Sequence, residues 1–238
     1  SDDYDFNRFA PDAGNPFRHE TDVGGGALKG SVPAGDYRLL YGAELYADRI
    51  ESTALRFGPF DSRVYGSASL AGERSWRSRE GVWTALLGGH WDDSNRESGE
   101  FLPVSRLSYA ETGANGGGWN AYVDASGASQ VPGYTALASS PSGGLFRGNP
   151  ALGRETSWNF EGGGGLDRGP WSFDAAAFLR RDEDLTDWTF DTGGGPARTA
   201  NPIDLWVYGI ELLAGYGWGD GFASLGYAWL EKDEDYGA

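Results

Sequence analysis

Few side chains in this sequence could carry out covalent chemistry. His19 and His90 are the only histidines, and neither has a serine nucleophile or a second metal ligand at a recognised spacing. Glu155 and Glu161 could form an acid and base pair, but on a strand they would lie roughly 20 Å apart. That distance is too large for both carboxyl groups to act on one bond. We therefore expect no catalytic residues and no enzymatic activity.

The composition excludes several other kinds of site. The sequence has no cysteine, which rules out disulfides, thiolate metal sites and a cysteine nucleophile. Its net charge is -16, so the phosphate backbone of a nucleic acid would be repelled over most of the surface. The four glycines at 162–165 lack the Lys-Ser/Thr pair and the helix that follow a phosphate-binding loop. We expect them to lie in a strand that bends or packs closely against its neighbours.

One run of acidic residues could bind a metal ion. Asp182, Glu183 and Asp184 offer carboxylate oxygens, the ligand type that Ca²⁺ prefers. Charged runs at strand ends more often form a solvated rim, and we favour that interpretation. The sequence therefore predicts no metal and no cofactor, with calcium at these three residues as the alternative.

Strands of alternating hydrophobicity must position these side chains. Every second residue from Trp171 to Leu179 is apolar, and a charged run follows. A pattern of this kind recurs about ten times along the chain, each time closed by a Gly, Asp or Pro turn, as in the strands of a transmembrane β-barrel. No segment approaches the roughly 18 consecutive apolar residues of a membrane helix. We predict strands at 19–32, 37–52, 62–76, 82–91, 100–109, 119–129, 154–166, 171–190, 204–216 and 222–231.

The connections between these strands alternate in length, as they do in outer-membrane barrels, where short turns face the periplasm and long loops face outside. Aromatic residues also end several of the apolar rows, which favours an aromatic girdle over the core of a sandwich. We therefore predict an all-β, antiparallel up-and-down transmembrane barrel. The short turns are 33–36, 77–81, 168–170 and 217–221, with 111–118 somewhat longer, and the long loops are 53–61, 92–99, 130–153 and 191–203.

Three segments resemble the barrels of TonB-dependent outer-membrane receptors. Residues 148–161 (GNPALGRETSWNFE) are similar to the family's GNPxLxPExSxxxExG stretch, with Gly153-Arg154 where Lys-Pro is common. Residues 178–188 and 205–212 are similar to its FyRridDLIdw and vriyGvEle strands and follow in the same order. The resemblance is closest to the cobalamin-receptor-like and siderophore-receptor-like branches.

The resemblance implies an outer-membrane receptor that imports a scarce ligand, such as a siderophore or a corrinoid, with energy from the TonB complex. Barrels of this family have about 22 strands and hold a plug domain inside. We therefore expect residues 1–238 to form part of such a barrel, with the plug and the terminal strands not present. The lack of an initiating Met and of a signal-peptide pattern at Ser1 indicates a processed or excised piece. The implied partners are the lipid bilayer, the imported ligand and, through the plug, the TonB complex.

Side chains on the long loops are the candidates for contacting the ligand. Aromatic rings and guanidinium groups suit a bulky polar chelate, although the same side chains could serve only to pack the loops. Two other functions stay open: a surface structural or adhesion protein built on the same wall, and a soluble β-sandwich that binds a ligand. The candidate ligand contacts are Tyr134, Phe146, Arg147, Trp188 and Phe190.

Overall fold

Ten long antiparallel strands, each paired with the next along the chain, form most of a single sheet. The computed structural model describes residues 2–4, 17–56, 61–113, 117–140, 145–190 and 195–235. A short strand β1 (Asp2–Tyr4) pairs with β2, a short strand β8 (Phe146–Arg147) runs parallel to β11, and the helix α1 (Tyr134–Ala138) follows β7. The long strands are β2 (Phe17–Ala34), β3 (Tyr37–Ser52), β4 (Ser62–Arg77), β5 (Gly81–Ser94), β6 (Glu100–Thr112), β7 (Gly118–Gln130), β9 (Glu155–Arg168), β10 (Trp171–Phe190), β11 (Arg198–Trp218) and β12 (Gly221–Asp235).

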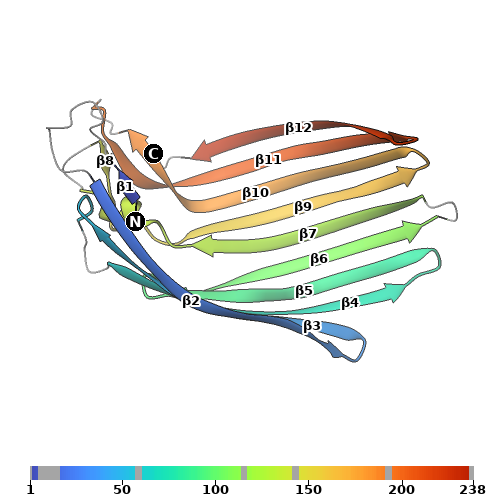
Figure 1. The fold of residues 1–238 in the computed structure, drawn as a ribbon. Helices are drawn as coiled ribbons and strands as arrows, with labels where there is room; N and C mark the ends of the chain where they lie inside the picture. The colour runs from blue at the N-terminus through green and yellow to red at the C-terminus, as the bar shows by residue number, and fades with distance from the viewer. Residues whose placement is uncertain are drawn as a thin grey trace.

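The sheet is bent into a trough. Figure 1 shows the long strands side by side in chain order, with the short turns at one end and the longer loops and β8 at the other. Within the described residues β12 pairs only with β11, and beyond the short strand β1 the other edge, β2, pairs only with β3. The described sheet is therefore an open wall.

Each predicted long strand is present, and most of them extend further than predicted. The largest difference is β11, which begins at Arg198 rather than at Asp204. Residues 198–203 lack clear alternation, but pairing with β10 holds them in the sheet. The predicted loop 130–153 contains α1 and β8, which the sequence pattern missed because both elements are too short to show a period.

Glycine explains why three of the connections are short. Gly35, Gly169 and Gly219 each have a positive φ, at 63°, 60° and 46°, in the turns after β2, β9 and β11. Residues with a side chain rarely adopt this conformation, whereas glycine adopts it without a steric penalty. These turns lie where the sequence predicted them, all at the same end of the sheet.

The strand register places the predicted apolar rows on one face of the sheet, which we call the outer face. Leu39 pairs with Gly72, Gly72 pairs with Leu87, and the match continues across the sheet from β2 to β12. Leu87 is 71% exposed and Leu225 is 76% exposed, so no second layer of the described chain covers this face. A single wall with an uncovered apolar face contradicts the alternative of a soluble β-sandwich. The described residues contain no helix that is long and apolar enough to cross a membrane.

Aromatic rings border the outer face at both ends, as in an aromatic girdle. At the short-turn end, Trp83 lies 6.4 Å from Trp76 and 4.9 Å from Tyr109, and Tyr109 lies 4.9 Å from Trp119, measured between ring centroids. At the loop end, Trp91 pairs with Phe101. Trp83 and Trp91 are separated by about 26 Å of strand, which is comparable with the apolar band of an outer-membrane barrel.

The alternation of faces predicts opposite responses at adjacent positions. Leu87 lies on the outer face midway between the two girdles, and Leu86 lies on the opposite face across from Glu73. We expect Leu87→Arg to lower the free energy of unfolding in lipid vesicles by about 2–4 kcal/mol, because the charge would face acyl chains. Leu86→Arg is the matched control and should have a much smaller effect. Equal losses in the two variants would contradict the assignment of the faces.

Candidate functional site

The face opposite the apolar rows, the inner face, carries the charged and hydrogen-bonded side chains. Arg38 pairs with Glu73 at 2.8 Å, and Arg106 lies 3.4 Å from Asp124. Other carboxylates accept hydrogen bonds from neutral donors, among them Glu161, which is 2.5 Å from the Tyr122 hydroxyl. Glu155 accepts from Gln130 at 2.6 Å and Glu100 accepts from Thr156 at 3.1 Å. This face is therefore polar and contains carboxylates with no basic partner in these contacts.

The segment that follows β7 crosses the trough at its loop end. One side of α1 packs with Ile50 and Leu55, at the end of β3. Its other side packs with Leu152 and with Ala200 of β11, against which the Trp188 ring also lies. Six strands separate β3 from β11 in the sheet order. We call residues 131–153 the crossing loop; its described parts, 131–140 and 145–153, therefore bridge strands that lie on opposite sides of the trough.

Contacts of Tyr134 attach the crossing loop to β3 and β4. Its hydroxyl donates to the Asp48 carboxylate at 2.6 Å, and the Arg63 guanidinium lies 4.0 Å from the centre of its ring. Arg63 also binds Asp48, at 2.7 and 3.0 Å. Burial, and then the hydrogen bond to Asp48, raise the pKa of the Tyr134 phenol above its usual value. The phenol thus stays protonated and keeps donating at neutral pH.

A cavity of about 340 Å³ lies beside this attachment, on the inner face. Tyr46 and Tyr65 stack in its wall with ring centroids 4.5 Å apart. Arg154 reaches it from the start of β9 and donates to the Ser129 hydroxyl at 3.0 Å. Its Nε and Nη2 atoms are buried and have no hydrogen-bond partner among the described residues. The carboxylates of Glu44, Asp92 and Asp93 also line the cavity, so it offers acceptors, donors and aromatic surface to a polar ligand.

The structure brings four of the five predicted ligand contacts together near β8, β10 and β11. Phe146 and Trp188 meet edge to face with centroids 5.2 Å apart, and the Phe190 ring, 63% exposed, lies under Arg198. Arg147 lies on β8, next to Thr199 of β11. Tyr134 is apart from them and buried, where it holds the crossing loop. Ligand contact by these five residues stays a prediction.

Two of the three candidate calcium ligands, Asp182 and Glu183, have side-chain partners. They lie at a bulge in β10, where the register shifts between Asp182 and Leu185 and Asp184 has a φ of 55°. Asp182 accepts from Ser157 and from Arg180, and Glu183 pairs with Arg181 at 2.8 Å. No group of three His, Asp or Glu side chains suited to a metal ion occurs in the part of the chain that is described.

Sequence reasoning did not single out the residues that line the cavity. Tyr46 and Tyr65 are on the polar rows of predicted strands, and Arg154 is the first residue of another predicted strand. All three lie where a strand meets a long loop. Polar rows next to long loops were the available signal. That Tyr46, Tyr65 and Arg154 line one cavity depends on the path of the crossing loop.

The attachment of Tyr134 predicts a local change in stability. Tyr134→Phe removes a hydrogen bond to a charged carboxylate, an interaction of about 1.5–3 kcal/mol. The Arg56 amide donates to the Ala138 carbonyl at 2.7 Å, so it reports on the attachment of the loop. We expect its hydrogen exchange to accelerate roughly 10- to 150-fold. Tyr41→Phe, on the outer face, is the control and should leave that amide unchanged; unchanged exchange in Tyr134→Phe would contradict the role of the hydroxyl.

Comparison with known proteins agrees with this fold. The family model described as "TonB dependent receptor-like, beta-barrel" matches residues 1–238, whereas a search of curated proteins found no match. The siderophore receptor PirA from Pseudomonas aeruginosa is similar with 18% identity and a TM-score of 0.65, over 91% of this chain and 41% of that one. The copper transporter OprC has 17% identity and a TM-score of 0.61, over 91% and 39%. The FrpB iron transporter from Neisseria meningitidis has 14% identity and a TM-score of 0.60, over 93% and 37%.

These matches confirm the predicted family and fold class. The chain spans about two fifths of the length of the three solved proteins, at identities that show the fold alone. Barrels of this family are transporters rather than enzymes and reside in the bacterial outer membrane, as the sequence resemblance implied. The apolar outer face is thus the surface that meets lipid. The chain belongs to the family of TonB-dependent receptors, as a segment of their β-barrel.

Proposed function

We propose that this chain supplies wall and outer loops to a receptor that imports a scarce ligand with energy from the TonB complex. The observation that carries the proposal is the polar cavity on the inner face, beside the crossing loop at the loop end. Long loops of outer-membrane barrels face outside, so a ligand arriving from there meets this end first. The cavity is the first site of capture.

The proposal includes a closed barrel made with further strands. An open sheet edge in hydrocarbon leaves backbone groups unpaired, which costs several kcal/mol per group. Because β12 pairs only with β11 in the described structure, its other edge must be covered by another strand of the receptor. The inner face of β11 and β12 also exposes Leu213 and Leu230, at 48% and 52%. A plug domain inside the barrel would cover them.

The ligand that we propose is a metal chelate such as a ferric siderophore or a corrinoid. Its peripheral polar groups would meet Arg154 and the carboxylates of the cavity, and its flat or aromatic parts would lie on Tyr46 and Tyr65. The structurally similar proteins are named a siderophore receptor, a copper transporter and an iron transporter. These names support a metal-containing cargo.

The proposal predicts a loss of affinity when the Arg154 guanidinium is removed. We expect Arg154→Ala, in the full-length receptor, to raise the Kd for the transported ligand roughly 10- to 150-fold, because a charged hydrogen-bond donor is lost. Binding and uptake are measured in cells with a panel of ferric siderophores, cobalamins and copper, with and without an uncoupler. Arg74→Ala is the control, since Arg74 pairs with exposed Asp36 at the opposite end of the barrel.

Two results would count against the proposal. Uncoupler-sensitive uptake with normal affinity in Arg154→Ala would move the capture site away from the cavity. If the receptor takes up no ligand of the panel but its removal abolishes attachment of cells to surfaces, the structural or adhesion function would be correct instead.

A further inference from the structure

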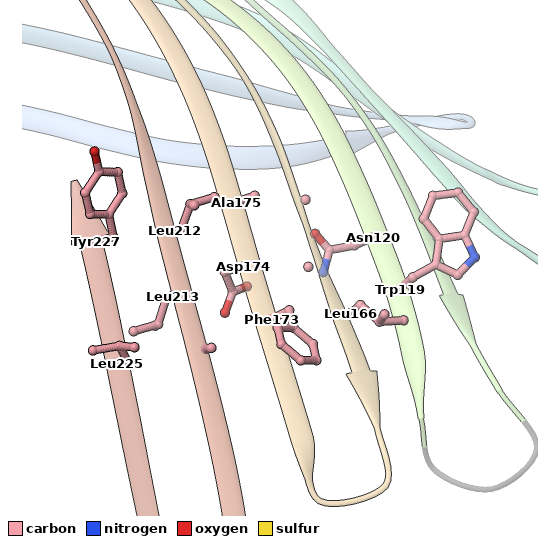
Figure 2. Close-up of a pocket in the computed structure, with 13 residues that line it drawn as sticks. Trp119, Asn120, Leu166, Phe173, Asp174, Ala175, Leu212, Leu213, Leu225 and Tyr227 are labelled. Carbon is pink, nitrogen blue, oxygen red and sulfur yellow. The ribbon is translucent and has the colours of Figure 1, made fainter. Parts of the chain in front are cut away.

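The outer face contains a depression where side chains are missing. It measures about 700 Å³ and lies near the turn between β9 and β10 (Figure 2). Gly164 of β9 pairs with Ala175 of β10, and these two small residues line its floor together with Ala214 of β11. A Cβ atom at Gly164 would collide with the carbonyl oxygen of Asn120, which shows how closely β7 and β9 approach there.

Large apolar side chains surround this floor. On the short-turn side Trp119, Leu166 and Phe173 lie next to one another in the strand register. Toward the edge of the sheet, Leu212 of β11 pairs with Tyr227 of β12. These walls belong to the apolar rows of the outer face, which in the outer membrane contact lipid. The depression can therefore accept an acyl chain.

The depression continues toward the short-turn rim and ends at a cation. A second hollow of about 370 Å³ shares Leu166 and Phe173 with the first and is also lined by Trp171 and Arg168. Arg168 is exposed and pairs with Trp171 in the register. It therefore lies on the outer face at the end of the apolar row of β9, level with the aromatic girdle. Arg74, at the same rim, is bound to Asp36 at 3.0 Å, whereas Arg168 has no ion pair among the described residues.

We propose that this surface binds one glycerophospholipid of the short-turn leaflet, with an acyl chain in the depression and the phosphate at Arg168. The surface suits both parts of such a lipid. The apolar walls exclude water from the acyl chain, and the Arg168 guanidinium binds the phosphate through charge-assisted hydrogen bonds. The chain as a whole has a net charge of -16 and repels anions. Preference for an anionic headgroup is therefore a local property of this site.

Two acidic side chains near this surface are accounted for. Asp174 lines the depression but belongs to the inner row of β10, and Glu111 belongs to an outer row. Glu111 lies on β6, beyond β7, and accepts hydrogen bonds from Trp119 at 3.1 Å and from Tyr109 at 3.4 Å. Two strand spacings, about 10 Å, separate β6 from β9. Asp167, which is adjacent to Arg168, belongs to the inner face because its partner Ser172 does.

Native mass spectrometry of the full-length receptor in detergent tests the proposal, with phosphatidylglycerol and phosphatidylcholine as the two probes. Wild-type receptor should retain one phosphatidylglycerol about fivefold more tightly than phosphatidylcholine, the effect expected of one arginine near an anionic surface. Arg168→Gln should abolish this preference. Ala175→Phe, whose ring would fill the depression, should remove the bound lipid of either kind.

Matched variants show whether the effects are local. Arg79→Gln removes a cation from another short turn, and Ala68→Phe adds a ring to the outer face on β4; neither should change lipid retention. Circular dichroism of each variant confirms that the sheet has formed.

Unchanged retention in both Arg168→Gln and Ala175→Phe would overturn the proposal. So would a receptor dimer that dissociates in Ala175→Phe, because the surface would then bind a second copy. Ligand uptake is not part of the readout, so failure here leaves the proposed import function standing.

Discussion

The register of the antiparallel pairing is the constraint on which the rest of this structure depends. Side chains alternate between faces with a period of two, so a slip of one residue in any pair would move the apolar row of one strand to the aqueous side. Leu39, Gly72, Leu87 and Ser105 stay in line across four strands. In lipid the backbone must also satisfy its hydrogen bonds internally, so the same pairing that fixes the faces makes the wall stable in a membrane.

A second level of organisation is built on this wall by the crossing loop. Strands alone cannot bring β3 and β11 together, because six other strands lie between them. The loop connects them through small hydrophobic clusters and through one buried charged group, Asp48, which is 8% exposed. Asp48 is stabilised by Arg63 and Tyr134 together, and a buried carboxylate that loses one such partner is costly. The position of the loop is thus tied to a particular set of polar contacts.

The sequence predicts the wall much better than the site. Ten strands, the positions of the short turns and the direction of the apolar rows follow from alternation and turn residues, since these depend on neighbours in the chain. The position of α1, the early start of β11 at Arg198 and the cavity beside Arg154 depend on contacts between residues far apart in sequence. Tyr134 illustrates the difference: its type and its place on a long loop suggested a ligand contact, which stays a prediction. Its hydrogen bond to Asp48, which lies 86 residues away in the sequence, depends on the path of the loop.

The glycines at 162–165 show how one stretch can shape both surfaces of a sheet. Gly164 belongs to the outer row, and its missing side chain forms the floor of the depression that faces lipid. Gly165 belongs to the inner row, where a Cβ atom would lie 2.7 Å from Asp174 Oδ1 and 3.0 Å from Asn120 Nδ2. Its absence leaves room for these two polar side chains next to the Gly165 backbone. Because adjacent residues face opposite sides, a run of glycines removes side chains from both faces of the sheet. A substitution at Gly164 or Gly165 would directly alter only one of the two faces.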